Sequence, residues 1–90
     1  MNKDRRKRLS EAIDMMHEAQ DKLQEAYDLI CECKDEEEEY RDNMPENLQG
    51  SEKYEMADSA VDSLDSAICT MDTLISEIDD AVSSVEEASE

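Results

Sequence analysis

The sequence predicts an all-α protein, a helical hairpin of two long antiparallel amphipathic helices that associates into a homo-oligomeric bundle. Its 90 residues include one glycine and one proline, too few for the closely spaced turns of a β-sandwich or barrel. Apolar residues recur at steps of three and four in two series, which is the period of a helix. We therefore expect a single domain over residues 1–90, with helices at roughly 4–42 and 51–88 and a loop at 43–50.

The first helix carries one apolar series that is interrupted only by Glu37. Large and small side chains alternate along it, and small residues allow a neighbouring helix to approach closely. The predicted contact column consists of Leu9, Ala12, Met16, Ala19, Leu23, Ala26, Ile30, Cys33, Glu37, Tyr40 and Met44.

The connecting segment is rich in residues that end and begin helices. The first helix should end near Pro45, because the residue before a proline avoids the helical region. Asn43 and Glu46 are spaced to cap one short helical turn, Gly50 can stop that turn at positive φ, and Ser51 can cap the second helix. A short connection makes the helices antiparallel. Residues at one level should then have numbers that add up to roughly 94.

The second helix has a wider apolar surface than the first. Its contact column is predicted to be Tyr54, Ala57, Val61, Leu64, Ile68, Met71, Ile75, Ile78, Val82 and Val85. A third apolar column consists of Ala60, Ala67, Leu74, Ala81 and Ala88. In the first helix, Ile13, Met15, Tyr27 and Leu29 also lie outside the predicted column. A lone hairpin would leave these residues exposed, so we predict a homodimer, most simply a four-helix bundle.

Charge divides the chain into a short basic start and a long acidic remainder. The net charge is −18; residues 1–8 contain five basic residues and one acid, and the rest contains four basic residues and 26 acids. Two roles fit the basic start: neutralising the acidic C-terminal end beside it, or forming an anion pocket where subunits meet. The residues of that candidate pocket are Arg5, Arg6, Lys7 and Arg8.

The sequence offers no pattern typical of an enzyme or a cofactor site. His17 is the only histidine, and a single histidine builds neither a catalytic triad nor a metal site. Cys31 and Cys33 point apart on a helix, so they cannot share a zinc ion, and Cys33 is expected in the core. No apolar run approaches the length of a membrane span. We expect a non-enzymatic protein with no cofactor and no bound metal, which does not associate with membranes.

Two places could serve recognition as well as structure. Glu37 lies in a core column, where Lys34 and Arg41 could pair with it or where it could fix the register of the helices. The loop and its flanks collect polar and aromatic side chains that serve either turn formation or the binding of a partner. These candidate partner- or ligand-binding residues are Tyr40, Arg41, Asn43, Asn47, Gln49, Ser51 and Tyr54.

The loop sequence DNMPENLQGSEKYE resembles the hairpin loop of short acidic hypothetical proteins from phages and prophages of Gram-positive bacteria. Those proteins are similar in length and share a basic start and acidic helices. The second helix, rich in Asp, Ser and Thr, and the three cysteines depart from that pattern. The family has no established activity. The resemblance implies a small accessory phage protein, located in the cytoplasm of the bacterial host cell, of a kind that often acts by binding.

Three hypotheses about function follow. In the first, the chain is a binding protein that occludes a host protein, such as a component of anti-phage defence. In the second, it is a sponge that holds a nucleotide immune signal in the basic pocket of the oligomer, with a tyrosine such as Tyr27 stacking on the base. In the third, its carboxylates mimic the phosphates of a nucleic acid, and such binding should weaken steeply with salt. Direct binding of nucleic acid is not expected from so negative a chain.

Overall fold

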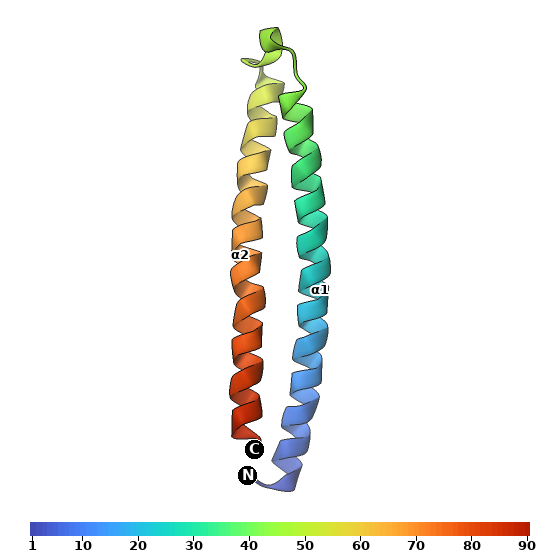
Figure 1. Ribbon diagram of the computed structural model, residues 1–90, viewed down its shortest axis with the longest axis vertical. Helices are drawn as coiled ribbons and strands as arrows, with labels where there is room; N and C mark the ends of the chain where they lie inside the picture. Colours follow the sequence, from blue (N-terminus) through green and yellow to red (C-terminus); the bar gives the residue numbers. More distant parts are fainter.

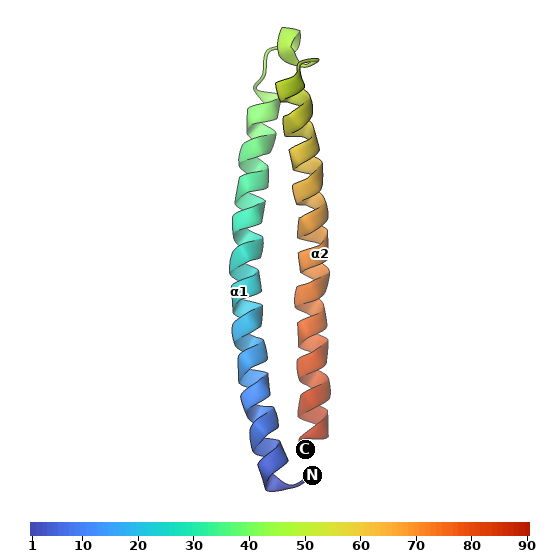
Figure 2. The ribbon, with the colours of Figure 1, turned by 180° about the vertical axis from the view of Figure 1, so that it is seen from behind.

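The computed structural model describes all 90 residues as two long helices joined by a short loop. Helix α1 spans Lys3–Asp42, the 3₁₀ helix η1 spans Glu46–Leu48, and helix α2 spans Glu52–Ala88. Figures 1 and 2 show α1 and α2 side by side over their whole length, with η1 at one end and both termini at the other. The Cα atoms extend over 70 × 15 × 14 Å. The predicted helical hairpin and its boundaries are thereby confirmed, each boundary to within one residue.

Side-chain caps begin both helices. The side chain of Asn2 accepts a hydrogen bond from the Arg5 N–H at 2.8 Å, so the basic start of the chain belongs to α1. The Ser51 hydroxyl accepts from the Tyr54 N–H at 3.3 Å and begins α2. Ser51 is thus the cap that the sequence predicts.

The loop differs in two details from its sequence prediction. Asn43 closes the end of α1, where its N–H donates to the Glu39 carbonyl, and no side chain caps η1. Gly50 does not adopt positive φ, and a Cβ atom added there would meet nothing within 4 Å. The predicted Asn43 cap and the left-handed Gly50 are therefore wrong. Backbone hydrogen bonds hold the turn instead, including Leu48 N–H to the Pro45 carbonyl at 2.9 Å.

The contact column of α2 lies where its apolar pattern predicts it. All ten of its residues are buried or half-buried, and Ala57, Val61 and Val82 are the only buried residues of the chain. Two helices enclose very little surface, because each can cover only one side of the other. The hairpin by itself therefore has a line of contact rather than an enclosed core.

Eight of the eleven residues in the predicted contact column of α1 are half-buried, and three are not. Ala19, Cys33 and Tyr40 are exposed, so the prediction that Cys33 lies in the core is wrong. The half-buried residues that take their place are Ile13, Gln20, Tyr27, Lys34 and Arg41. Long polar side chains can cover an interface with their aliphatic stems while their charged ends reach polar partners. A prediction of the contact surface from apolar residues alone does not identify such a column.

The register of the hairpin follows from its cross-helix contacts. Side-chain contacts join Gln20 to Asp79, Lys34 to Asp65, and Arg41 to Asp58, and each pair of numbers adds up to 99. The Gln20 amide also donates to the Ile75 carbonyl, a pair that adds up to 95. Side chains tilt toward the N-terminus of their helix. In antiparallel helices, two residues whose side chains touch therefore have residue numbers that add up to more than those of two residues whose backbones lie at the same level. This tilt accounts for the difference from the predicted value of about 94.

Candidate interaction surfaces

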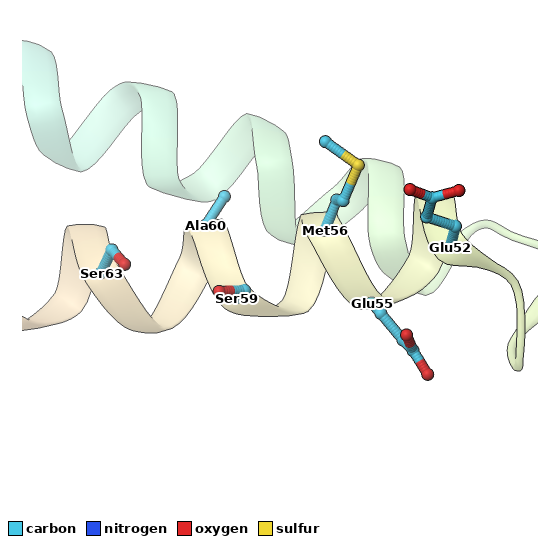
Figure 3. Close-up of a pocket in the computed structure, with 6 residues that line it drawn as sticks. All are labelled: Glu52, Glu55, Met56, Ser59, Ala60 and Ser63. Carbon is cyan, nitrogen blue, oxygen red and sulfur yellow. The ribbon is translucent and has the colours of Figure 1, made fainter.

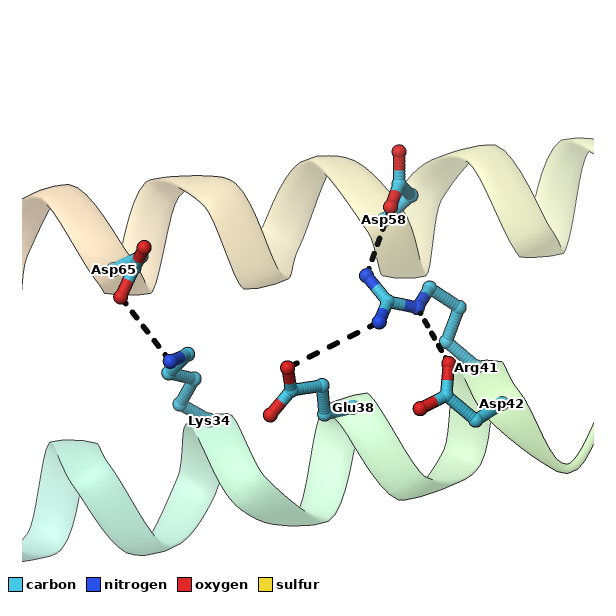
Figure 4. Close-up of polar contacts among 6 residues, drawn as sticks. All are labelled: Lys34, Glu38, Arg41, Asp42, Asp58 and Asp65. Carbon is cyan, nitrogen blue, oxygen red and sulfur yellow. Dashed lines mark hydrogen bonds and ion pairs between the residues drawn. The ribbon is translucent and has the colours of Figure 1, made fainter.

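One edge of the hairpin is held together by three polar contacts between the helices. We call it the polar edge, and it consists of Gln20, Lys34 and Arg41 of α1 with Asp58, Asp65 and Asp79 of α2. The Gln20 amide donates to Asp79 at 2.6 Å, the Lys34 ammonium lies 3.1 Å from Asp65, and the Arg41 guanidinium lies 2.9 Å from Asp58. The contacts are 14 and 7 residues apart along each helix, about four and two turns, because positions seven apart share one side of a helix. Figure 4 shows the part near the loop.

Arg41 is the centre of the polar edge at its loop end. Its side chain is 18% exposed, and its guanidinium contacts Asp42 at 3.0 Å, Asp58 at 2.9 Å and Glu38 at 4.0 Å. The hydrogen bonds that it donates to Asp42 and Asp58 raise its pKa, against the opposing effect of desolvation. Arg41, predicted as a partner-binding residue, is thus occupied by contacts within the chain that join α1 to α2.

Two further groups on this side have shifted pKa values. The pKa of Lys34 is raised by its hydrogen bond to Asp65 and by the charge of that carboxylate. The pKa of the Tyr27 phenol is raised by electrostatic repulsion from Cys31, then by desolvation and by Asp72. Both groups therefore keep their protons to higher pH than usual.

Glu37 lies half-buried at the loop end without an ion pair. Its predicted partners bind elsewhere, Lys34 to Asp65 and Arg41 to Asp58. Glu37 instead lines a surface depression together with Tyr40, Lys53, Met56, Ala57 and Ala60. The carboxylate thus lies at a surface that combines apolar and charged groups.

The loop residues proposed for recognition are mostly exposed. Asn43, Asn47 and Gln49 are exposed, and the apolar Leu48 between the last two is 47% exposed. Tyr40 is exposed as well, whereas Ser51 and Tyr54 are half-buried, and Ser51 serves as the cap of α2. The free side chains of this set therefore cluster at the tip of the rod.

The four consecutive basic residues of α1 do not converge on one point. Successive helical residues turn by 100°, so Arg5, Arg6, Lys7 and Arg8 point to different sides. Arg6 donates to the Glu90 carbonyl at 3.3 Å, and Arg8 pairs with Asp4 at 3.1 Å. Only Arg5 and Arg8 line a common depression, which they share with Met1 and Leu9.

The edge of the hairpin opposite the polar edge is apolar. On α1, the line of residues seven apart that contains Ala19 lies about 100° around the helix axis from the line that contains Lys34. On α2, the line that contains Ala60 lies about 140° around the axis from the line that contains Asp65. Tyr40 of α1 and Ala60 of α2 line one depression, so these two columns share one side. We call this side the apolar face. Its large exposed residues are Met15, Leu29, Tyr40, Met56 and Leu74, each 41–67% exposed.

The shallow depressions are all open to solvent along the rod. One on α2 is lined by Glu52, Glu55, Met56, Ser59, Ala60 and Ser63. Figure 3 shows Met56 and Ala60 pointing to one side of α2 and Glu55 to the other. This depression therefore joins the apolar face to the acidic outer side of the helix.

The sequence identified Arg41 as a candidate binding residue but not as a contact between α1 and α2. It did not identify Gln20, Asp58, Asp65 and Asp79 as contact residues. The signal was present in the spacing, because both sets recur at intervals of seven or fourteen in antiparallel order. A search for polar residues of complementary charge at heptad spacing would have found them.

No group of three or more His, Cys, Asp or Glu side chains is arranged to hold a metal ion. Neither helix contains a stretch that is long and apolar enough to cross a membrane. Comparison of the chain with protein-family models, curated proteins and solved structures finds no match.

Proposed function

We propose that this chain is a non-catalytic binding protein of phage origin, which acts in the cytoplasm of a bacterial host. As a homodimeric four-helix bundle, it would occlude a host protein of anti-phage defence. The phage context comes from the resemblance of the loop, and the binding role comes from the surface of the hairpin.

The observation that carries the proposal is the exposed loop at the tip of a 70 Å rod. Hydrogen bonds around η1 hold the backbone that carries the exposed side chains of Asn43, Asn47, Leu48 and Gln49. An ordered polar loop with one exposed apolar residue can bind a protein at little entropic cost. A rod of this shape can insert its tip where a globular protein could not reach.

The test compares capture of a bacterial partner by the wild type and by a loop variant. Tagged protein is incubated with host lysate, and the retained proteins are identified by mass spectrometry. The variant combines Asn47→Ala with Gln49→Ala, and the matched control is Gln24→Ala, an exposed amide in the middle of α1. We expect one host protein to be retained by the wild type and the control and to be lost from the loop variant. Equal retention by all three would refute binding through the loop.

Mimicry of nucleic acid is the second candidate, supported by the sign of charge on α2. From Tyr54 to Glu90 the chain contains acidic residues and no lysine or arginine. Although Asp58, Asp65 and Asp79 face α1 partners, Asp62, Asp72, Glu77 and Asp80 remain exposed without a partner on α1. Capture that falls steeply between 50 and 200 mM salt, by roughly 10³-fold or more, would favour this mode.

The nucleotide sponge requires basic groups from more than one chain. A single hairpin directs only Arg5 and Arg8 to one depression. Titration of the protein with cyclic nucleotides in a calorimeter tests this alternative, and heat that disappears in Arg5→Ala would support it.

A further inference from the structure

The apolar face of the hairpin has no covering element within the chain. It carries five of the seven large hydrophobic side chains that are exposed, and the other two, Met1 and Leu48, lie at the ends. We propose that this face binds the same face of a second copy, with the two hairpins running in opposite directions. The proposal rests on the homodimer of the proposed function and adds to it the contact surface and the direction.

The column on α2 is symmetric about its centre. It consists of Ala60, Ala67, Leu74, Ala81 and Ala88, and it reads the same in both directions from Leu74. In an antiparallel contact with two-fold symmetry, each residue contacts the residue of the second copy whose position in the sequence is equally far from the central residue, in the opposite direction. Leu74 then lies against Leu74 of the second copy, and alanines face alanines, which allows the helices to approach closely.

The columns of α1 are symmetric about the same level. In one column, Met15 and Leu29 are seven residues on either side of residue 22, and Arg8 and Glu36 are fourteen residues on either side. The neighbouring column has Arg5 and Tyr40 at its two ends and Ala19 and Ala26 at its centre. The numbers 22 and 74 add up to 96, within the range of 95 to 99 found for contacts between α1 and α2. A single two-fold axis therefore serves both helices.

The ends of the face have complementary charges. The depression at the open end contains Arg5 and Arg8. The one at the loop end contains Glu37, Tyr40 and Lys53, and the acidic run Asp35 to Glu39 outweighs the single charge of Lys53. Hairpins in opposite directions place these depressions against each other, so that Arg5 meets a tyrosine ring and Arg8 meets carboxylates. Hairpins in the same direction would instead bring together two acidic loop ends, each containing the run Asp35 to Glu39.

The area is sufficient for a stable dimer. The face follows the long dimension and one short dimension of the hairpin, 70 × 15 Å between Cα atoms. It can therefore bury roughly 1,000 Å² per copy, above the 800 Å² or so typical of specific interfaces. Two residues near the axis would each face their own charge in the second copy, Lys22 on α1 and Glu77 on α2; both are at the outer margin of the face, and Lys22 already pairs with Glu25 at 3.5 Å.

A disulfide tests the position of the two-fold axis. In a variant with its three native cysteines replaced by alanine, Leu74→Cys should oxidise readily to a covalent dimer. Ser66→Cys, on the exposed outer side of α2, is the matched control and should stay monomeric on a non-reducing gel. Circular dichroism verifies that both variants are folded. If Leu74→Cys forms no more covalent dimer than Ser66→Cys, the apolar face is not the contact.

The direction is tested with a nitroxide label on Gln49→Cys at the loop tip, in the same cysteine-free chain. Opposite hairpins should place the two labels about 70 Å apart, at 1.5 Å per residue, whereas hairpins in the same direction would place them within about 20 Å. A dimer by sedimentation with the short distance overturns the proposed direction and leaves the homodimer standing. The mass of one 10.3 kDa chain at micromolar concentration overturns both.

Discussion

Shortening Val61 tests the contact between α1 and α2 most directly. Val61 is 5% exposed, so Val61→Ala removes two buried carbon atoms, worth about 1.6 kcal/mol at 0.8 kcal/mol each, plus a cavity term. Alanine is the better helix former and returns about 0.5 kcal/mol. The expected net loss is about 1–2 kcal/mol per chain, which lowers Tm by roughly 5–10 °C for a chain of this size.

The assay is thermal unfolding followed by circular dichroism at one fixed protein concentration, because Tm of a dimer depends on concentration. The matched control is Thr73→Ala, which removes a β-branched residue from the exposed side of the same helix. It gains the same helix propensity without losing buried surface, and its Tm should stay equal or rise by a few degrees. A Val61→Ala protein as stable as the Thr73→Ala control would refute the described packing.

Four other outcomes follow from the structure. Ser51→Ala removes the cap of α2 and should cost about 1 kcal/mol in urea unfolding, and no change in the midpoint would argue against the cap. Gly50→Ala should be neutral or stabilising by up to about 1 kcal/mol, since φ is not positive there and the site is open; a clear loss would contradict this. Added NaCl should raise Tm by screening the net charge of −18, and a falling Tm would show that ion pairs dominate. Because the folded-state pKa values of Lys34 and Tyr27 are raised, their stabilisation is complete below about pH 10 and is lost as pH rises further; unfolding curves at pH 9 and 11 that coincide would contradict this.

The surfaces differ in how far the sequence could predict them. The exposed loop was predictable, because proline, asparagine and serine act through local backbone preferences. The role of Arg41 was not, because its partner Asp58 belongs to another helix and the pairing depends on the register. Glu37 was expected to pair with Lys34 or Arg41, yet both neighbours bind aspartates of α2 that are better placed.

The sequence by itself determined the two helices, their ends and the contact column of α2, because helical periodicity and capping act over a few residues. Only the tertiary structure decided which side of α1 faces α2. Two columns of α1 were available, one of alanines with Cys33 and Tyr40, and one of longer side chains including Gln20, Lys34 and Arg41. The second column packs against α2, since its long side chains reach the aspartates there, whereas Ala19, Cys33 and Tyr40 of the first column are left exposed on the apolar face. That choice depends on distances between atoms far apart in the chain.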